Sequence, residues 1–144
     1  MDKGKSYSEL LHASCVAVGP AGVLILGASG SGKSALALEL MAYGAVLVAD
    51  DRVEITAGDG ALSARCPKAI RGHIEARGVG ILAADTVATA RVVLVVDLDQ
   101  VERERLPETR TITLNGIELP LVHTPVHGHF PAAILQYLKG GRSA

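Results

Sequence analysis

The sequence predicts a single α/β domain with a mixed β-sheet that is rich in strands and carries few helices. Three features favour this class. A glycine-rich loop, residues 27–32, follows an apolar segment and precedes a segment of strong helix formers. Residues 45–49 and, after Arg91, residues 92–96 are apolar throughout, which is typical of strands buried on both faces. Short turns at residues 58–60 and 115–116 separate segments with the composition of β-hairpins.

The first part of the chain is divided by glycine and proline. Residues 13–18 and 23–26 are small and apolar, and the Gly-Pro-Ala-Gly segment between them predicts two strands joined by a tight turn. Residues 34–43 are dense in Ala, Leu, Glu and Met, and Gly44 follows where the end of a helix favours glycine. A helix is therefore expected there, and residues 45–49 after it predict a buried central strand.

The middle of the chain is less regular. Residues 53–56 and 61–66 flank a Gly-Asp-Gly turn and predict a hairpin. Residues 69–80 hold three glycines and no clean hydrophobic period, so a loop with unusual polar content is expected. Residues 91–96 predict a second fully buried strand, and the charged residues 99–108 that follow are expected to be exposed.

The C-terminal part combines a hairpin with a short helix. Residues 111–114 and 117–119 flank Asn115-Gly116, a dipeptide that strongly favours a two-residue hairpin turn. Residues 131–139 begin with proline and end before two glycines, as a short helix does. Because no internal repeat or linker is visible, residues 1–144 are expected to form one domain.

Composition excludes several classes of protein. With 144 residues, 49% of them hydrophobic and 20% charged, the chain can bury a sizeable core. Only 3% of residues are aromatic and the net charge is −1, which argues against a nucleic-acid partner. No apolar segment reaches the ~18 residues that span a bilayer, and residues 1–11 do not resemble a signal peptide, so a cytoplasmic protein without a membrane partner is expected. Two cysteines, Cys15 and Cys66, are too few for a disulfide framework and are expected to be buried thiols.

The strongest local signal matches G-x-x-x-x-G-K-[ST] in full, between a strand and a helix. In this motif glycines let backbone N–H groups converge on phosphate oxygens, and the helix N-terminus adds its positive dipole end. Lys33 supplies a point charge to the β- and γ-phosphates, and the Ser34 hydroxyl can ligate Mg²⁺. The motif alone does not distinguish a kinase from an ATPase or a regulator. The predicted nucleotide-binding residues are Gly27, Ala28, Ser29, Gly30, Ser31, Gly32, Lys33 and Ser34.

Two apolar strands end in aspartate, and either acid suits the phosphate loop by pattern alone. Residues 91–97 end in Asp97, as in a generic Walker B strand, whereas residues 45–51 end in Asp50 and Asp51. Adjacent strand residues point to opposite faces, so a double acid can divide its tasks between the phosphate and the structure, which favours the pair. Further along, Glu75 and Arg77 lie among glycines. Two interpretations remain open there: a solvated loop, or a site in which Glu75 is a second carboxylate near the metal and Arg77 supplies a positive charge.

Four separated motifs follow one another along the chain. The first is His12-Ala-Ser, which precedes the loop, and the second is residues 27–55, GASGSGKSALALELMAYGAVLVADDRVEI. The third is IEARGVGIL, residues 74–82, and the fourth is Glu-Arg-Leu, residues 104–106. Together they resemble the catalytic domain of the HPr kinase/phosphorylase family, in which the first motif has a catalytic histidine and the fourth has an active-site arginine. The resemblance runs from about residue 12 to residue 126.

The resemblance implies an activity and a fold. Family members use MgATP to phosphorylate a serine of HPr, the phosphocarrier protein of the sugar phosphotransferase system, and many also reverse the reaction by phosphorolysis. Their fold is a P-loop kinase domain similar to phosphoenolpyruvate carboxykinase, and they are typically hexamers. A homo-oligomer with HPr or a paralogue as partner, and with ATP and Mg²⁺ as ligands, is therefore expected.

The resemblance also assigns roles to individual residues. Asp51 lies at the family's spacing from Lys33 and matches its acid/base. Ser34 and Glu75 would hold Mg²⁺. His12, which by pattern alone is more typical of a core histidine at a strand end, and Arg105 would complete the catalytic site.

The chain departs from the family pattern at three places. It begins just before His12 and so resembles the short, catalytic-domain-only forms without the N-terminal regulatory domain. The family's P-V-R-P-G-R stretch is Pro-Val-His-Gly-His-Phe at residues 125–130, which leaves the phosphorylase reaction open because both arginines are missing. The C-terminal helix is short, at about residues 131–139.

The predicted function is therefore that of an ATP-dependent protein serine kinase acting on HPr or a related carrier. A MgATP-binding regulatory module without efficient phosphotransfer is the first alternative. A P-loop small-molecule kinase is the second, and it is disfavoured because no arginine-rich lid segment is visible.

Overall fold

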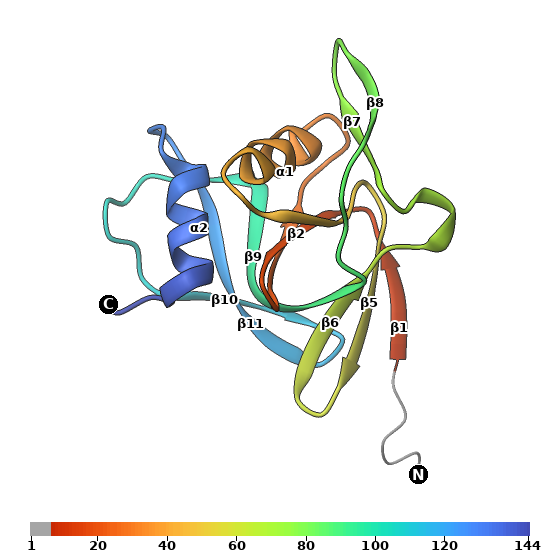
Figure 1. The fold of residues 1–144 in the computed structure, drawn as a ribbon. Coiled ribbons are helices and arrows are strands. Elements are labelled where there is room, and N and C mark those ends of the chain that lie inside the picture. Colours follow the sequence, from red (N-terminus) through yellow and green to blue (C-terminus); the bar gives the residue numbers. More distant parts are fainter. Residues whose placement is uncertain (1–6) are drawn as a thin grey trace.

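A mixed β-sheet forms the body of the protein in the computed structural model, which describes residues 7–144. The expectation that the first residues form no signal peptide rests partly on residues 1–6, which lie outside that range. The strands of the sheet are β1 (Tyr7–Leu11), β2 (Ser14–Val18), β3 (Ala21–Leu26), β4 (Val46–Ala49), β5 (Val53–Gly58), β6 (Ala61–Arg65), β9 (Thr89–Glu102), β10 (Arg110–Leu114) and β11 (Ile117–Pro125). Their order is β1-β5-β6-β9-β3-β2-β4, and β11 joins β10 to β9 (Figure 1).

The long strand β9 is the centre of this sheet. Its first residues pair with β6 in antiparallel fashion, its middle pairs with β3 in parallel, and its later part pairs with β11 in parallel. The predicted strand at residues 91–96 is confirmed, but it is not fully buried, since Arg91 is exposed and Val93 is half-buried. The strand, however, continues to Glu102, which is buried and accepts a 3.0 Å hydrogen bond from Arg110 Nε, so the expectation that residues 99–108 are all exposed is wrong at that position. This hydrogen bond lowers the pKa of the Glu102 carboxyl below its ordinary value.

Strand β4 is buried but does not lie in the centre of the sheet. Among the described residues β2 is the one strand that pairs with it, and its other edge has an isolated bridge from Leu47 to Thr86. Because β4 ends the strand order, the prediction of a central strand is wrong in position. Its burial comes from layers on both sides. Leu47 packs in the cluster beneath the helices, whereas Val48 and Ala49 pack in the cluster on the opposite face. An apolar strand sequence therefore indicates that both faces of the strand are covered, but it does not indicate that both edges pair with other strands.

The predicted hairpins β2–β3, β5–β6 and β10–β11 are all confirmed as antiparallel pairs. Asn115 and Gly116 have φ values of 49° and 80°, the left-handed conformations that a two-residue hairpin turn requires. Residues 69–80, expected to be a loop, instead contain a 3₁₀ turn (Lys68–Ile70), β7 (His73–Ala76) and the start of β8 (Gly80–Ala83). Strands β7 and β8 form a separate two-stranded sheet of four residues each with few buried positions, and such short strands show no hydrophobic period in the sequence.

Two helices cover one face of the main sheet: α1 (Lys33–Ala42) and α2 (Phe130–Gly140). Their bounds lie close to the predicted ones. They pack on alternate side chains of the sheet, and the buried residues of this layer include Val16, Val23, Ile25, Leu94 and Val96 from the strands and Leu36, Leu40, Ile134 and Leu138 from the helices. The strand-rich mixed α/β class is thus confirmed. No helix in the described part of the chain is long and apolar enough to cross a membrane.

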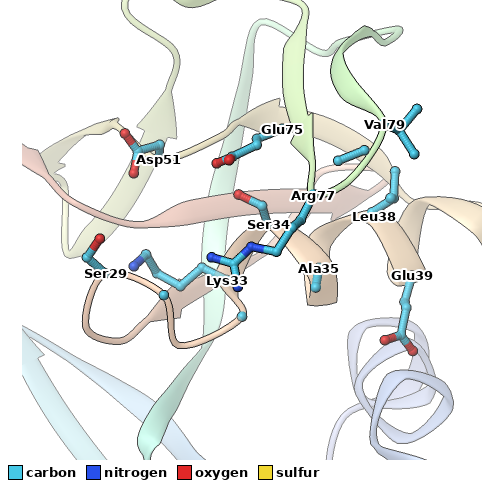
Figure 2. A pocket seen from close by; sticks show the side chains of 13 residues that line it. Ser29, Lys33, Ser34, Ala35, Leu38, Glu39, Asp51, Glu75, Arg77 and Val79 are labelled. Carbon is cyan, nitrogen blue, oxygen red and sulfur yellow. The ribbon is translucent and has the colours of Figure 1, made fainter.

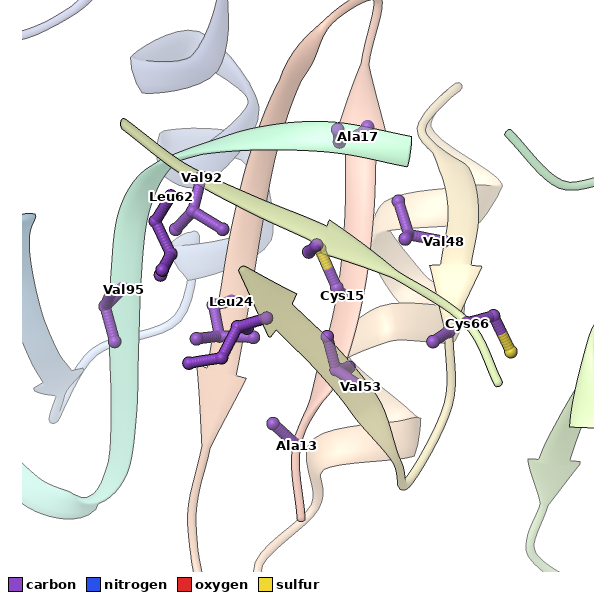
Figure 3. Close-up of a cluster of buried hydrophobic side chains, with 14 of the residues drawn as sticks. Ala13, Cys15, Ala17, Leu24, Val48, Val53, Leu62, Cys66, Val92 and Val95 are labelled. Atoms are coloured by element: carbon purple, nitrogen blue, oxygen red, sulfur yellow. The ribbon is translucent and has the colours of Figure 1, made fainter. Parts of the chain in front are cut away.

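The opposite face of the sheet is covered by other strands rather than by helices. Strands β5 and β6 place Val53, Ile55 and Leu62 over Cys15 and Leu24 (Figure 3). All five side chains are fully buried. The sheet therefore curls over its own second face, which explains how two helices suffice for residues 7–144.

Both cysteines lie in this second layer. Burial raises the pKa of the Cys15 thiol to about 12 and also raises the pKa of the Cys66 thiol. The expectation of buried thiols is confirmed. A thiolate, not a thiol, is the nucleophile, so neither side chain is prepared for cysteine chemistry.

Thiol labelling tests this packing. At pH 8 an aromatic disulfide reagent should leave both thiols of the native protein unmodified during the time in which it modifies both thiols of the urea-unfolded chain. Spectrophotometric titration of the free thiols measures this difference. Rapid labelling of the native Cys15→Ala or Cys66→Ala variant would show that the remaining thiol is packed more loosely than described.

Candidate active site

The phosphate loop connects β3 to α1 and depends on glycine at both fixed positions of its motif. Gly32 caps α1 with φ of 104°, a conformation that other residues rarely adopt. Gly27 has no room for a side chain, because a Cβ there would lie 2.4 Å from Ser31 Oγ and 3.2 Å from Leu98 Cβ. The Ser31 N–H donates to Ala28 O at 2.9 Å and closes the loop.

Lys33 folds over this loop at the beginning of α1. Its side chain is largely buried, and Nζ donates to Gly27 O at 2.8 Å and to Ala28 O at 3.1 Å. The ammonium group therefore lies among the loop carbonyls and beside the positive end of α1. This arrangement concentrates positive potential where an anionic group can approach.

Asp50 is the buried acid at this edge of the sheet. Its Oδ1 accepts hydrogen bonds from Ser34 Oγ at 2.6 Å and from Ser14 Oγ at 2.8 Å. Its Oδ2 accepts a hydrogen bond from the Glu75 N–H at 3.0 Å. The sequence predicts Asp50 only as one member of the Asp50–Asp51 pair, and nothing in the pattern indicates its hydrogen bond with Ser34.

Asp51 has the complementary position. It adopts φ of 69°, is exposed and lines the cavity over the loop. Its N–H donates to Ser14 Oγ at 3.2 Å, and its carbonyl accepts a hydrogen bond from the Ala13 N–H at 3.2 Å. The adjacent acids therefore differ in burial and partners, as expected for a divided pair: Asp50 lies beneath the site and Asp51 faces it.

A cavity of about 560 Å³ lies above the loop. Figure 2 shows the carboxylates of Asp51 and Glu75 across it from Lys33. The structure thus brings Lys33 and Ser34 of the loop together with Asp51 and Glu75, from three separate parts of the chain. The lining residues are Ser29, Gly30, Gly32, Lys33, Ser34, Ala35, Leu38, Glu39, Asp51, Glu75, Ala76, Arg77 and Val79.

The oxygen atoms at the loop suit Mg²⁺. No group of three or more His, Cys, Asp or Glu side chains within residues 7–144 forms a dedicated metal cage. Mg²⁺ does not need such a cage, because it is usually held by one or two protein ligands together with waters and substrate phosphates. The Ser34 hydroxyl and the Glu75 carboxylate, which both line the cavity, fit that requirement.

The other two predicted catalytic residues lie outside this cavity. His12 is exposed in the bend between β1 and β2, one residue before Ala13, whose N–H contacts Asp51. Arg105 lies after β9 and lines a second cavity of about 410 Å³ near the N-terminus of α2. Arg77, considered from sequence only as a possible cation, lies in the first cavity.

Asp97 does not line the cavity, although β9 places it beside the loop. It pairs with Leu26 at the end of β3, and its Oδ1 accepts a 2.9 Å hydrogen bond from the Asp99 N–H. Asp99 in turn accepts a 2.9 Å hydrogen bond from the Ala28 N–H. These acids therefore support the turn after β9 and the base of the loop.

The fold and the site define a sheet-rich α/β domain suited to binding a phosphorylated ligand beside two carboxylates. A family model described as the HPr Serine kinase C-terminal domain matches residues 5–135. The chain belongs to this family.

Relatives of known name are consistent with this membership. The HPr kinase/phosphorylase of Chromobacterium violaceum is 47% identical over 83 residues, which are 57% of this chain and 26% of that protein. The HPr kinase/phosphorylase of Caldanaerobacter subterraneus subsp. tengcongensis is 39% identical over 139 residues, with 88% of this chain and 46% of that protein covered. The chain therefore spans less than half the length of these curated relatives.

A solved structure is similar over nearly the whole chain. The structure of the Hpr(Ser) kinase/phosphatase from Coxiella burnetii matches with a TM-score of 0.75 and 28% sequence identity. The match covers 91% of this chain and 94% of that chain.

A double-mutant cycle tests the packing inside the loop. Gly27→Ala should lower the free energy of unfolding by about 1–3 kcal/mol, because the new methyl group overlaps Ser31 Oγ. Ser31→Ala alone should change it by less than about 0.5 kcal/mol, since Ser31 Oγ is buried without a hydrogen-bond partner among the described residues. The double variant should recover part of the loss in urea titrations, and strict additivity would contradict the contact.

Proposed function

We propose that this domain is an ATP-dependent protein serine kinase whose acceptor is HPr or a related phosphocarrier of the sugar phosphotransferase system. One observation carries the proposal: Lys33 and Ser34 of the phosphate loop face the same cavity as Asp51, in a chain that belongs to the HPr serine kinase family. A phosphate donor and a base are both needed for transfer to a hydroxyl group.

Each residue of the cavity has a role in this proposal. The loop amides and Lys33 bind and orient the phosphates of ATP. Ser34 and Glu75 would hold Mg²⁺, which supplies charge neutralisation on the phosphate oxygens when bound, and Asp50 orients the Ser34 hydroxyl from beneath.

Asp51 accepts the proton of the acceptor serine hydroxyl. The serine oxygen forms a bond to the γ-phosphorus as the bond between that phosphorus and the leaving oxygen of ADP breaks. Because Asp51 is exposed at the cavity, a protein segment can reach it, whereas Asp50 is closed off beneath.

The proposal keeps His12 and Arg105 as predicted site residues. His12 is close along the chain to the Ala13–Asp51 hydrogen bond, which supports a place beside Asp51. Arg105 is exposed on the segment after β9 and lines the second cavity. A cytoplasmic location and a homo-oligomer, hexameric by resemblance, are predictions of the same proposal. The proposal leaves phosphorolysis open, because residues 125–130 lack both arginines of the family's stretch.

A MgATP-binding regulatory module without efficient phosphotransfer is the second candidate. The position of Arg105 outside the loop cavity favours it, because an active-site arginine stabilises charge only where it touches the phosphate.

A phosphotransfer assay separates the two candidates. The protein with ATP, Mg²⁺ and HPr should produce phosphoserine on HPr, detected by mass spectrometry. Lys33→Met keeps the aliphatic stem and removes the charge, so it should abolish transfer in a protein that still unfolds cooperatively. ATP binding without phosphoserine in the wild-type protein would favour the regulatory module, and normal transfer by Lys33→Met would refute the kinase site.

The two aspartates at strand ends give the sharpest comparison. Asp51→Asn keeps the shape and removes the base, so kcat should fall by about 10²–10⁴-fold while MgATP affinity changes little. Asp97→Asn should keep near-normal kcat, because the asparagine oxygen can still accept the hydrogen bond from the Asp99 N–H. Steady-state kinetics on both variants decides the assignment, and the reverse pattern would move the catalytic acid to β9.

A further inference from the structure

Ser14 is a buried hydroxyl that contacts both acids of the Asp50–Asp51 pair. It is the first residue of β2 and its exposed fraction is 0%. Its Oγ donates to Asp50 Oδ1 at 2.8 Å and accepts a hydrogen bond from the Asp51 N–H at 3.2 Å. One atom therefore fixes a side chain of one acid and the backbone of the other.

The surroundings make this hydroxyl unusual. The residues that follow Ser14 in β2, Cys15, Val16 and Ala17, are apolar and fully or almost fully buried. A polar side chain in such a strand is costly unless its hydrogen bonds are satisfied, and the acid pair satisfies them. The core gains nothing from the hydroxyl that a methyl group would not give, so the explanation lies at the acid pair.

The backbone at this point needs an external restraint. The pairing of β2 with β4 shifts register between Cys15 and Val16, which leaves Val48 as the extra residue just before the acids. Asp51 then adopts φ of 69°, which is uncommon for a residue with a side chain. The Ser14 hydroxyl and the Ala13 N–H hold the two sides of this residue, and no ladder pair does so.

We propose that Ser14 is a positioning residue of the phosphotransfer site, which sets Asp50 against Ser34 and turns Asp51 toward the cavity through one shared hydroxyl. The proposal rests on the proposed function. Ser14 itself does not line the cavity and touches no substrate, so it acts only through the two acids.

Two of the expected effects are separable. Loss of the bond to Asp50 should weaken the Mg²⁺-dependent part of ATP binding, because Asp50 shares its Oδ1 between Ser14 and Ser34. Loss of the bond from Asp51 should lower kcat, because the base is no longer held toward the cavity. Metal-free ATP binding, which depends on Lys33 and the loop amides, should not change.

The test compares Ser14→Thr with Ser14→Val, which have nearly the same shape and differ in the hydroxyl group. With a fluorescent ATP analogue, Ser14→Val should raise the half-saturating Mg²⁺ concentration about ten-fold, the scale of one hydrogen bond to a charged group, with metal-free affinity within about two-fold of wild type. In the HPr assay its kcat should fall about 10–100-fold with little change in KM for HPr. Ser14→Thr should recover most of both losses.

Ser63→Ala is the matched control, because Ser63 is an exposed serine of β6 whose Oγ donates to Thr56 O at 3.3 Å, and it should change neither quantity. Equal loss in Ser14→Thr and Ser14→Val would overturn the proposal, and so would an unchanged Mg²⁺ requirement in Ser14→Val. A parallel loss of metal-free affinity would also overturn it, since that reports general damage to the loop. If the wild-type protein binds MgATP but transfers no phosphate, the proposed function fails while the Mg²⁺ titration still decides the role of Ser14.

Discussion

A buried carboxylate joins four elements of the structure at the edge where the phosphate loop lies. Asp50, just beyond β4, accepts hydrogen bonds from Ser14 of β2, from Ser34 of α1 and from the Glu75 N–H of β7. Removing an acid from water without partners costs several kcal/mol, so this arrangement is stable only when all three donors are in place. Asp50 therefore links the loop helix to the β7–β8 hairpin, in addition to the packing of Ile74 against α1.

The same constraint explains why the cavity has its particular walls. Strands β7 and β8 form a separate two-stranded sheet, which is marginal alone in water. It is held by Ile74, which is buried beneath α1, and by the hydrogen bond from Glu75 to Asp50. Figure 1 shows this hairpin extending beyond α1, away from the main sheet. Because Glu75 is anchored through its backbone, its carboxylate remains free to face the cavity, where Figure 2 places it.

Much of the fold was predictable because its signals are local. Glycine-containing turns and helix formers act over a few residues, so the hairpins and both helices appear near the expected positions. The position of β4 was not predictable, since burial of its two faces gives no information about which strands it pairs with. The β7–β8 hairpin was missed because only Ile74 and Ala76 of its eight strand residues are buried, and two buried positions do not establish a period.

The candidate site also has one part that was predictable from the sequence and one part that was not. The loop was evident from sequence, because its glycines, lysine and serine are contiguous and their chemistry is fixed by the backbone. The roles within the acid pair were not evident from the residue pattern, because alternation along a strand assigns opposite faces but not which face belongs to which residue. Only the family resemblance predicted the acid/base role of Asp51.

That assignment depends on the shifted pairing near Cys15 and on the left-handed conformation of Asp51, neither of which has a sequence signature. A slip of one residue in this pairing would exchange the two faces. Asp50, which accepts the hydrogen bond from Ser34, would then be exposed to solvent, and Asp51, which faces the cavity, would be buried. The division of tasks between adjacent acids is thus a property of strand register, which is why a buried hydroxyl that fixes the backbone at this point has consequences for both of them.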